Sequence, residues 1–190
     1  TDFLEKTTPD LYRGTRAEHN DVGDADDPAA GYVWDAALKK GLMVRNYGEY
    51  SEAMEADDAG AARTRALIPS LASCTHPLYP PFDMSITDQR RADIWIEELH
   101  EFEKTGKMPA LEILHLPNDH TSGAKKGLPT PAAAVADNDL ALGRMVEGLS
   151  RSSFWKKMAI LVVEDDAQNG VDHIDGHRTV ALVASPYAKR

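Results

Sequence analysis

The side chains best suited to chemistry gather in the stretch LVVEDDAQNGVDHIDGH, residues 161–177. An apolar run ends there in acidic residues, including Asp165 and Asp166, and His173 and His177 follow within a short loop. Two adjacent carboxylates repel each other in a low-dielectric cleft, and a bound cation removes that penalty. Carboxylates and neutral imidazoles together suit a hard or borderline divalent ion. These four residues are therefore candidate metal ligands.

A second polar group follows another apolar run upstream. The run ALEILHL leads into PNDHT, which contributes Asp119 and His120. Both groups come directly after a predicted strand, and open α/β sheets bind ligands beyond the carboxyl ends of their strands. If the two strands are parallel neighbours, Asp119 and His120 face the same crevice as residues 165–177.

Each signal taken alone also has an ordinary structural explanation. A pair of aspartates after a strand is often a helix N-cap or a solvated turn. Asp119 beside His120 can be a loop ion pair, and single histidines such as His173 or His177 are common on protein surfaces. Only the joint pattern of carboxylates and imidazoles at two strand ends favours a metal site.

The elements that must position these residues alternate between helix and strand patterns. YVWDAALKK has helical spacing and ends near Gly41, and the run LMVRNY after it is typical of a strand. Thr87 can cap a helix whose apolar stripe runs from Ala92 to Phe102 and which ends at Gly106, and Pro131 opens another helix. With the apolar runs ALEILHL, MAILVV and TVALVAS as strands, this order predicts an α/β fold with a mostly parallel sheet flanked by helices.

Several details follow from the same patterns. Residues 51–85 are expected to hold a helical piece and a long proline-rich loop, and residues 51–98 could be an insertion or cap. Asp137 and Asp139 are expected to interact favourably with the dipole of the helix that Pro131 opens. The expected buried residues of that helix are Val135, Leu142, Met145, Val146 and Leu149, and the three tryptophans, Trp34, Trp95 and Trp155, are expected in the core.

Length and composition narrow the class of protein. The 190 residues, 42% of them hydrophobic, can form one sizeable domain, so we expect a single α/β domain over residues 1–190. A net charge of −10 argues against nucleic acid as a partner. No run approaches the roughly 18 apolar residues of a membrane span. The single cysteine, Cys74, excludes an internal disulfide. The first residue is not Met, so we expect a processed or excised piece of a longer chain.

The C-terminal motifs resemble those of a known family. VVEDDAQNGVDHI followed by HRTVALVASPYAKR is similar to the bacterial phosphoesterases, which include phospholipases C and acid phosphatases of the alkaline phosphatase superfamily. Asp165 and Asp166 stand where that family has an Asp-Glu pair, His173 matches the histidine of its Asp-His motif, and Ser185-Pro186-Tyr187 closes the match. Upstream, PALEILHLPNDHTSG is similar to the family's strand with a histidine-bearing loop, which makes His120 a site residue. The similarity covers about residues 31–50 and 99–190.

This resemblance implies an alkaline-phosphatase-like but incomplete domain and a metal-dependent phosphoesterase activity. His120 and His173 would contact the metal or the phosphoryl oxygens, and Asp119, Asp165, Asp166 and His177 would complete the ligand set. The ion could be zinc, manganese, iron or calcium, the substrate a phosphate ester, and the location periplasmic or extracellular.

The chain also departs from the family pattern. Asp166 is one carbon shorter than the family's Glu, and Asn169-Gly170 replaces a double glycine. The family's N-terminal metal motif and its Ser or Thr nucleophile have no match, so we expect the N-terminal remainder of a parent chain to supply them and this chain alone to be inactive. The alternative is a non-catalytic divalent-metal-binding or interaction module on the same fold. A phosphomutase would need a sugar-phosphate cap, for which residues 51–98 are short.

Overall fold

The structure is a computed structural model that describes residues 31–55, 63–164 and 180–189. The described residues divide after Met145 into two compact units. The prediction of one domain over residues 1–190 stays a prediction.

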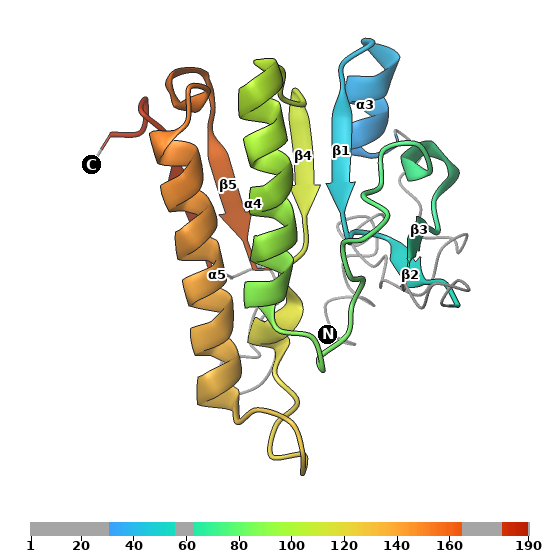
Figure 1. Cartoon of the computed structure of the whole chain (residues 1–190), viewed down its shortest axis with the longest axis vertical. Coiled ribbons are helices and arrows are strands. Elements are labelled where there is room, and N and C mark those ends of the chain that lie inside the picture. The colour runs from blue at the N-terminus through green and yellow to red at the C-terminus, as the bar shows by residue number, and fades with distance from the viewer. Residues whose placement is uncertain (1–30, 56–62, 165–179, 190) are drawn as a thin grey trace, which may run out of the picture. The chain divides into compact units, whose positions relative to one another are not determined.

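The first unit contains a parallel pair of strands, β1 (Val44–Tyr47) and β4 (Leu111–Leu114). Figure 1 shows the two strands side by side and pointing the same way, with the helices α3 (Val33–Lys39) and α4 (Asp88–Thr105) flanking them. Parallel strands need a crossover connection, which here includes α4. The predicted α/β class, with parallel strands flanked by helices, is confirmed.

The two faces of the β1–β4 pair have different characters. Because side chains alternate along a strand, Val44 lies on the same face as its register partner Leu111, and Arg45 lies with Glu112 on the other. The first face packs on an apolar core that includes residues of α3 and of the segment after β3; its buried members are Trp34, Ala37, Val44, Tyr50, Ile68, Leu71 and Cys74. The second face carries charged and aromatic side chains and meets α4, where Trp95 donates a hydrogen bond to Glu112.

Helix α4 forms where the sequence predicts it. The Thr87 hydroxyl accepts a hydrogen bond of 3.2 Å from the Arg90 backbone N–H, and Gly106 ends the helix in the left-handed conformation with φ 67°. Ala92, Trp95 and Leu99 are at most 2% exposed, which confirms the core of the predicted apolar stripe.

Helix α5 (Pro131–Arg151) begins at the predicted proline, but its predicted buried face is partly wrong. The buried positions include Ala134, Ala141 and Met145, whereas Val135 is 47% exposed. The prediction is confirmed for Met145 and Leu149, both buried, whereas Leu142 and Val146 are only partly buried and the remaining buried positions are small alanines, which allow close packing. The dipole role expected for Asp137 and Asp139 is also wrong, because both lie beyond the first turn, where that effect is confined.

The helical piece expected after residue 51 is not found in the described part of that segment. Strands β2 (Ser51–Ala53) and β3 (Thr64–Ala66) pair antiparallel there, followed by the 3-10 turn η1 (Pro69–Leu71). The alanine-rich sequence favours a helix by intrinsic propensity, but cross-strand pairing overrides it: the carboxylate of Glu52 pairs with the guanidinium of Arg65 at 2.5 Å.

The second unit contains the C-terminal end of α5, the 3-10 turn η3 (Trp155–Lys157), and the strands β5 (Ile160–Val163) and β6 (Ala181–Ala184). The two strands fall in the predicted runs and pair antiparallel, with Leu161 opposite Val183.

The Ser-Pro-Tyr motif closes this unit. The Ser185 hydroxyl donates to the Met158 carbonyl at 2.9 Å, and the Tyr187 hydroxyl donates to the Lys156 carbonyl at 2.6 Å. These bonds fasten the residues after β6 to those before β5, which gives the motif a structural role. Trp155, expected in the core, is only partly buried. Within the described ranges, no helix has the length and apolar character of a membrane span.

Candidate functional site

The candidate site lies in the 3-10 turn η2 (Pro117–His120), which follows β4. The His115 N–H donates to the Tyr47 carbonyl at 3.0 Å, which extends the β1–β4 pairing one residue towards the turn. Asp119 and His120 therefore come just beyond the carboxyl end of a parallel strand, as the sequence predicts. Asp119 is partly buried and His120 is exposed.

A buried carboxylate fixes the backbone of this turn. Asp88 Oδ2 accepts hydrogen bonds of 3.0 Å from the Asn118 backbone N–H and from Asn138 Nδ2, and Asp88 Oδ1 accepts one of 3.1 Å from Arg91 Nη1. The side chains of Asp88 and Arg91 are both 0% exposed. Burial raises the pKa of Asp88, and the Asn118 hydrogen bond and the Arg91 charge oppose this effect.

Asp137 completes this network, which we call the Asp88 hub: Asp88, Arg91, Asn118, Asp137 and Asn138. Asp137 Oδ2 accepts from the Asp88 N–H and from Asn118 Nδ2, both at 2.6 Å. Asn138 Nδ2 also donates to the Leu116 carbonyl at 2.8 Å, at the start of η2. The turn that carries Asp119 and His120 is thus bonded to both α4 and α5.

The hub also forms hydrogen bonds with the loop before α4. Arg91 Nη1 donates to the Ile86 carbonyl at 2.7 Å, and Nη2 donates to the carbonyls of Pro81 at 2.7 Å and Asp83 at 3.1 Å. Phe82, in that loop, contacts the His120 ring edge-to-face, with ring centroids 5.5 Å apart and planes at 81°. The Arg91 guanidinium therefore holds the backbone on both sides of Phe82, whose ring lies beside the candidate site.

The backbone after His120 is strained. Thr121 has φ 58° and ψ 168°, a conformation that is essentially restricted to glycine and costs a side-chain-bearing residue about 1–3 kcal/mol. Its carbonyl oxygen lies 2.9 Å from His120 Nδ1. Strain of this kind persists only where the surroundings impose it, and here the Thr121 N–H is held by the Asn118 carbonyl at 3.1 Å.

The predicted metal ligands divide into two groups. The structure brings Asp119 and His120 together in one turn. Asp165, Asp166, His173 and His177 lie outside the described residues, so their convergence with His120 stays a prediction. Within residues 31–55, 63–164 and 180–189, no three His, Cys, Asp or Glu side chains are grouped so that they could hold a metal ion.

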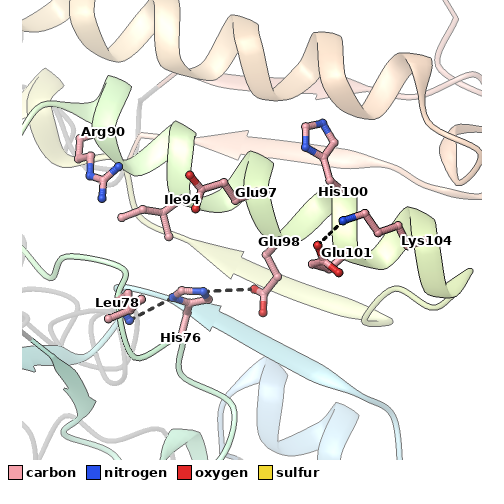
Figure 2. A pocket seen from close by; sticks show the side chains of 9 residues that line it. All are labelled: His76, Leu78, Arg90, Ile94, Glu97, Glu98, His100, Glu101 and Lys104. Atoms are coloured by element: carbon pink, nitrogen blue, oxygen red, sulfur yellow. Dashed lines mark hydrogen bonds and ion pairs between the residues drawn. The ribbon is translucent and has the colours of Figure 1, made fainter. Parts of the chain in front are cut away.

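A second polar region lies in an open depression of about 550 Å³ beside α4, which we call the α4 groove. Figure 2 shows Glu98 and His76 pointing towards each other in it, while His100 points away from them. The lining residues are His76, Leu78, Arg90, Ile94, Glu97, Glu98, His100, Glu101 and Lys104.

The most enclosed carboxylate of the groove is neutralised within the protein. Glu98 pairs with Arg45 through both guanidinium Nε, at 2.9 Å, and Nη2, and it accepts a hydrogen bond of 2.6 Å from the Tyr47 hydroxyl. His76 Nε2 lies 3.9 Å from Glu98 Oε2, and His76 Nδ1 accepts from the Leu78 N–H at 3.2 Å. Burial lowers the pKa of His76, and the Glu98 charge opposes that shift. These contacts suit a structural role better than the binding of a cation.

A second, partly buried acid is Glu112, the register partner of Arg45 on β4. Trp95 Nε1 donates to its Oε2 at 2.9 Å, while its Oε1 is buried without a hydrogen-bond partner. Burial, with a contribution from the Glu98 charge, raises the pKa of Glu112 to about 7. A protonated Glu112 fits this environment, since a neutral acid loses less on desolvation than a carboxylate.

The Asp88 hub was not predicted from the sequence. Asp88 looked like an ordinary acidic residue in the first turn of a helix, which is where such residues are common. One signal was present: Asn138 falls within the helical stripe of Ala134, Ala141 and Met145. A polar residue on a buried face needs a hydrogen-bond partner, and this identifies Asn138 as part of a buried network.

Comparison with known proteins finds one likeness of structure. No protein-family model and no curated protein matches the chain. The structure is similar to the crystal structure of a protein in the alkaline phosphatase superfamily from Vibrio parahaemolyticus, with 15% sequence identity and a TM-score of 0.49. The match covers 80% of this chain, and the chain spans 40% of the length of that protein. Likeness at this level bears on neither substrate nor mechanism.

Proposed function

We propose that this chain forms part of a metal-dependent phosphoesterase. The observation that carries the proposal is the placement of Asp119 and His120 beyond the carboxyl end of β4, in a turn fastened by the Asp88 hub. The motif VVEDDAQNGVDHI, which begins in β5 with Val162, supplies the other predicted donors and the resemblance to phosphoesterases.

The donor chemistry of the described residues suits a divalent ion. Asp119 offers carboxylate oxygens, and His120 offers the ring nitrogen that does not contact Thr121. The Asp88 carboxylate beside the turn already accepts hydrogen bonds on both oxygens and pairs with Arg91, so its role is to orient the turn and not to bind the ion. Two donors alone do not make a site, and the proposal requires Asp165, Asp166 and either His173 or His177 to supply the others.

The proposed reaction needs a bound divalent ion, side chains that hold it and an attacking hydroxyl. A bound divalent ion would lower the pKa of an attacking hydroxyl and offset the charge that builds up on the transferring phosphoryl group. Asp165 and Asp166 would hold the ion, His120 and His173 would contact the ion or the phosphoryl oxygens, and Asp119 would act as a ligand or orient one. The attacking hydroxyl would come from a segment ahead of the matched motifs.

Metal binding is the first test. Calorimetric titration of the chelator-treated chain with Mn²⁺ or Zn²⁺ is expected to give a binding site, which His120→Ala or Asp165→Ala weakens about tenfold or more. Matched controls are His100→Ala and Asp139→Ala, which remove exposed side chains elsewhere in the same unit and should leave the affinity unchanged. Equal losses in the controls and the site variants would remove the support for a specific site.

Hydrolysis is the second test, and it separates the proposal from its alternative. We expect the 190-residue chain to cleave p-nitrophenyl phosphate slowly or not at all, and the natural gene product that contains it to cleave a phosphate ester in a reaction that His120→Ala abolishes. Metal binding without turnover in that longer protein would favour a non-catalytic metal-binding module. Robust turnover by the 190-residue chain, lost in Asp165→Ala, would show that its own residues include the nucleophile.

A further inference from the structure

The His120 ring has a partner that determines which of its nitrogens carries the proton. His120 Nδ1 lies 2.9 Å from the carbonyl oxygen of Thr121. A carbonyl oxygen can only accept a hydrogen bond, so Nδ1 must be the donor. In the neutral ring the proton is therefore on Nδ1, and Nε2 keeps a lone pair.

The unusual backbone of Thr121 makes this contact possible. At φ 58° and ψ 168° the Thr121 peptide is turned so that its carbonyl meets the ring of the preceding residue. The turn is held on both sides: the Thr121 N–H donates to the Asn118 carbonyl at 3.1 Å, and the Thr121 hydroxyl accepts from the Gly123 N–H at 3.3 Å. Asn118 is in turn held by a hydrogen bond to Asp88, so the hub also restricts the position of the Thr121 carbonyl.

A second contact restricts the rotation of the ring. The Phe82 ring lies edge-to-face with His120 and stacks on His115, at centroid distances of 5.5 Å and 6.1 Å. An exposed histidine with one local hydrogen bond would usually sample several rotamers. Here a hydrogen bond from one ring nitrogen and an aromatic contact act together on the same ring.

We propose that Thr121 is a positioning residue, which holds His120 in the Nδ1–H tautomer and so presents Nε2 to an incoming ligand. The assignment of that ligand as a divalent cation rests on the proposed function; the assignment of the tautomer does not. A metal-ligating histidine commonly has its other ring nitrogen fixed by a carbonyl or carboxylate. Thr121 would supply that carbonyl within the next residue of the chain.

Nitrogen NMR of the histidine rings tests this proposal without metal or substrate. The chain is labelled with ¹⁵N-histidine, the His120 signals are assigned by their loss in His120→Gln, and long-range ¹H–¹⁵N correlations are recorded at a pH where the ring is neutral. We expect the unprotonated nitrogen to be Nε2. A proton on Nε2 would overturn the proposal.

A glycine substitution tests the role of Thr121 itself. Thr121→Gly frees the peptide to rotate, so we expect His120 to become a mixture of tautomers while the melting temperature stays unchanged or rises through relief of strain. Lys126→Gly places the same change at an exposed position of the following loop and should leave the tautomer as it is. An unchanged His120 tautomer in Thr121→Gly would assign the ring geometry to something other than Thr121.

Mn²⁺ titration then connects the tautomer to the ligand. The amide oxygen of glutamine reaches the place of Nε2 and that of asparagine the place of Nδ1, so His120→Gln should retain more Mn²⁺ affinity than His120→Asn, by about tenfold. The reverse order would refute the role of Nε2. If no form of the chain binds Mn²⁺, the proposed function fails, and the tautomer measurement still decides the role of Thr121.

Discussion

Two polar regions of the first unit, the Asp88 hub and the α4 groove, contain similar charged side chains that are paired in different ways. In the hub, a fully buried Asp–Arg pair has donors on both carboxylate oxygens and fixes a turn whose last side chain, His120, is exposed. In the groove, Glu98 is surrounded by Arg45, Tyr47 and His76, and the neighbouring Glu112 keeps an unpaired buried oxygen. The hub fixes a turn that leaves the His120 ring exposed, whereas the charged groups of the groove neutralise each other. Buried charge thus supports a candidate site at the hub, where the turn that it fixes ends in the exposed His120 ring, and not in the groove, where the charged side chains pair with one another.

Removal of the hub carboxylate is expected to cause the largest loss in the free energy of unfolding. Asp88→Ala leaves the Arg91 guanidinium buried without its charge partner and frees the Asn118 N–H, and breaking a buried pair in this way costs about 3–5 kcal/mol. Urea unfolding measures the loss. The matched control is Asp93→Ala, which breaks a half-exposed pair between α4 and Arg144 and should cost no more than about 1 kcal/mol. Equal costs would mean that the hub is no more than a surface network.

The strongest response of stability to pH is expected from Glu112, whose pKa is affected by the charge of the groove residue Glu98. The Glu112 pKa of about 7 in the folded chain lies above the ordinary value of 4.5, so the folded state binds more protons between these values. Stability should therefore be greatest below pH 4.5 with respect to this group and fall as the pH rises through 7. Glu112→Gln removes the penalty and should stabilise the chain at pH 8 by on the order of 2 kcal/mol, with little effect near pH 4.5.

Thermal unfolding across this pH range tests the Glu112 prediction. Glu101→Gln, at an exposed carboxylate of α4, is the control and should change stability by roughly 0.5 kcal/mol or less at either pH. If Glu112→Gln destabilises the chain at pH 8, the carboxylate is ionised and paired, and the contrast between hub and groove disappears.

The smallest expected effect concerns the helix that both regions share. Thr87→Ala removes the N-cap of α4 and should cost about 1 kcal/mol. Because the cap adjoins Asp88 and lies far along the helix from Glu98, amide exchange should increase at Arg90 and Arg91 and stay unchanged near Glu98. Thr105→Ala, at the other end of α4, is the control. Faster exchange around Glu98 in Thr87→Ala would show that the two regions are not independent.

Local features of this fold could be predicted from the sequence. The apolar runs became β1, β4, β5 and β6, Thr87 and Gly106 bound α4, and the polar residues after β4 fall where a parallel strand ends. These features depend on residues within a few positions of each other, where capping and periodicity act.

The remaining features depend on contacts between distant residues. Asp88 and Asn138 are 50 positions apart and Arg45 and Glu98 are 53, so no local pattern links either pair. The β2–β3 pairing was missed because alanine-rich sequence near Ala53 favours a helix until a second strand is available. The exposed Val135 shows the same limit, since burial depends on which neighbour a helix meets.

The proposed function requires one cation that is bound both by the turn after β4 and by residues 165–177. The most direct measurement is paramagnetic broadening of histidine ring signals by substoichiometric Mn²⁺. A shared site should broaden the His120 and His173 signals together while that of the exposed His100 stays sharp. Broadening of His173 without His120, or of all three equally, would contradict it.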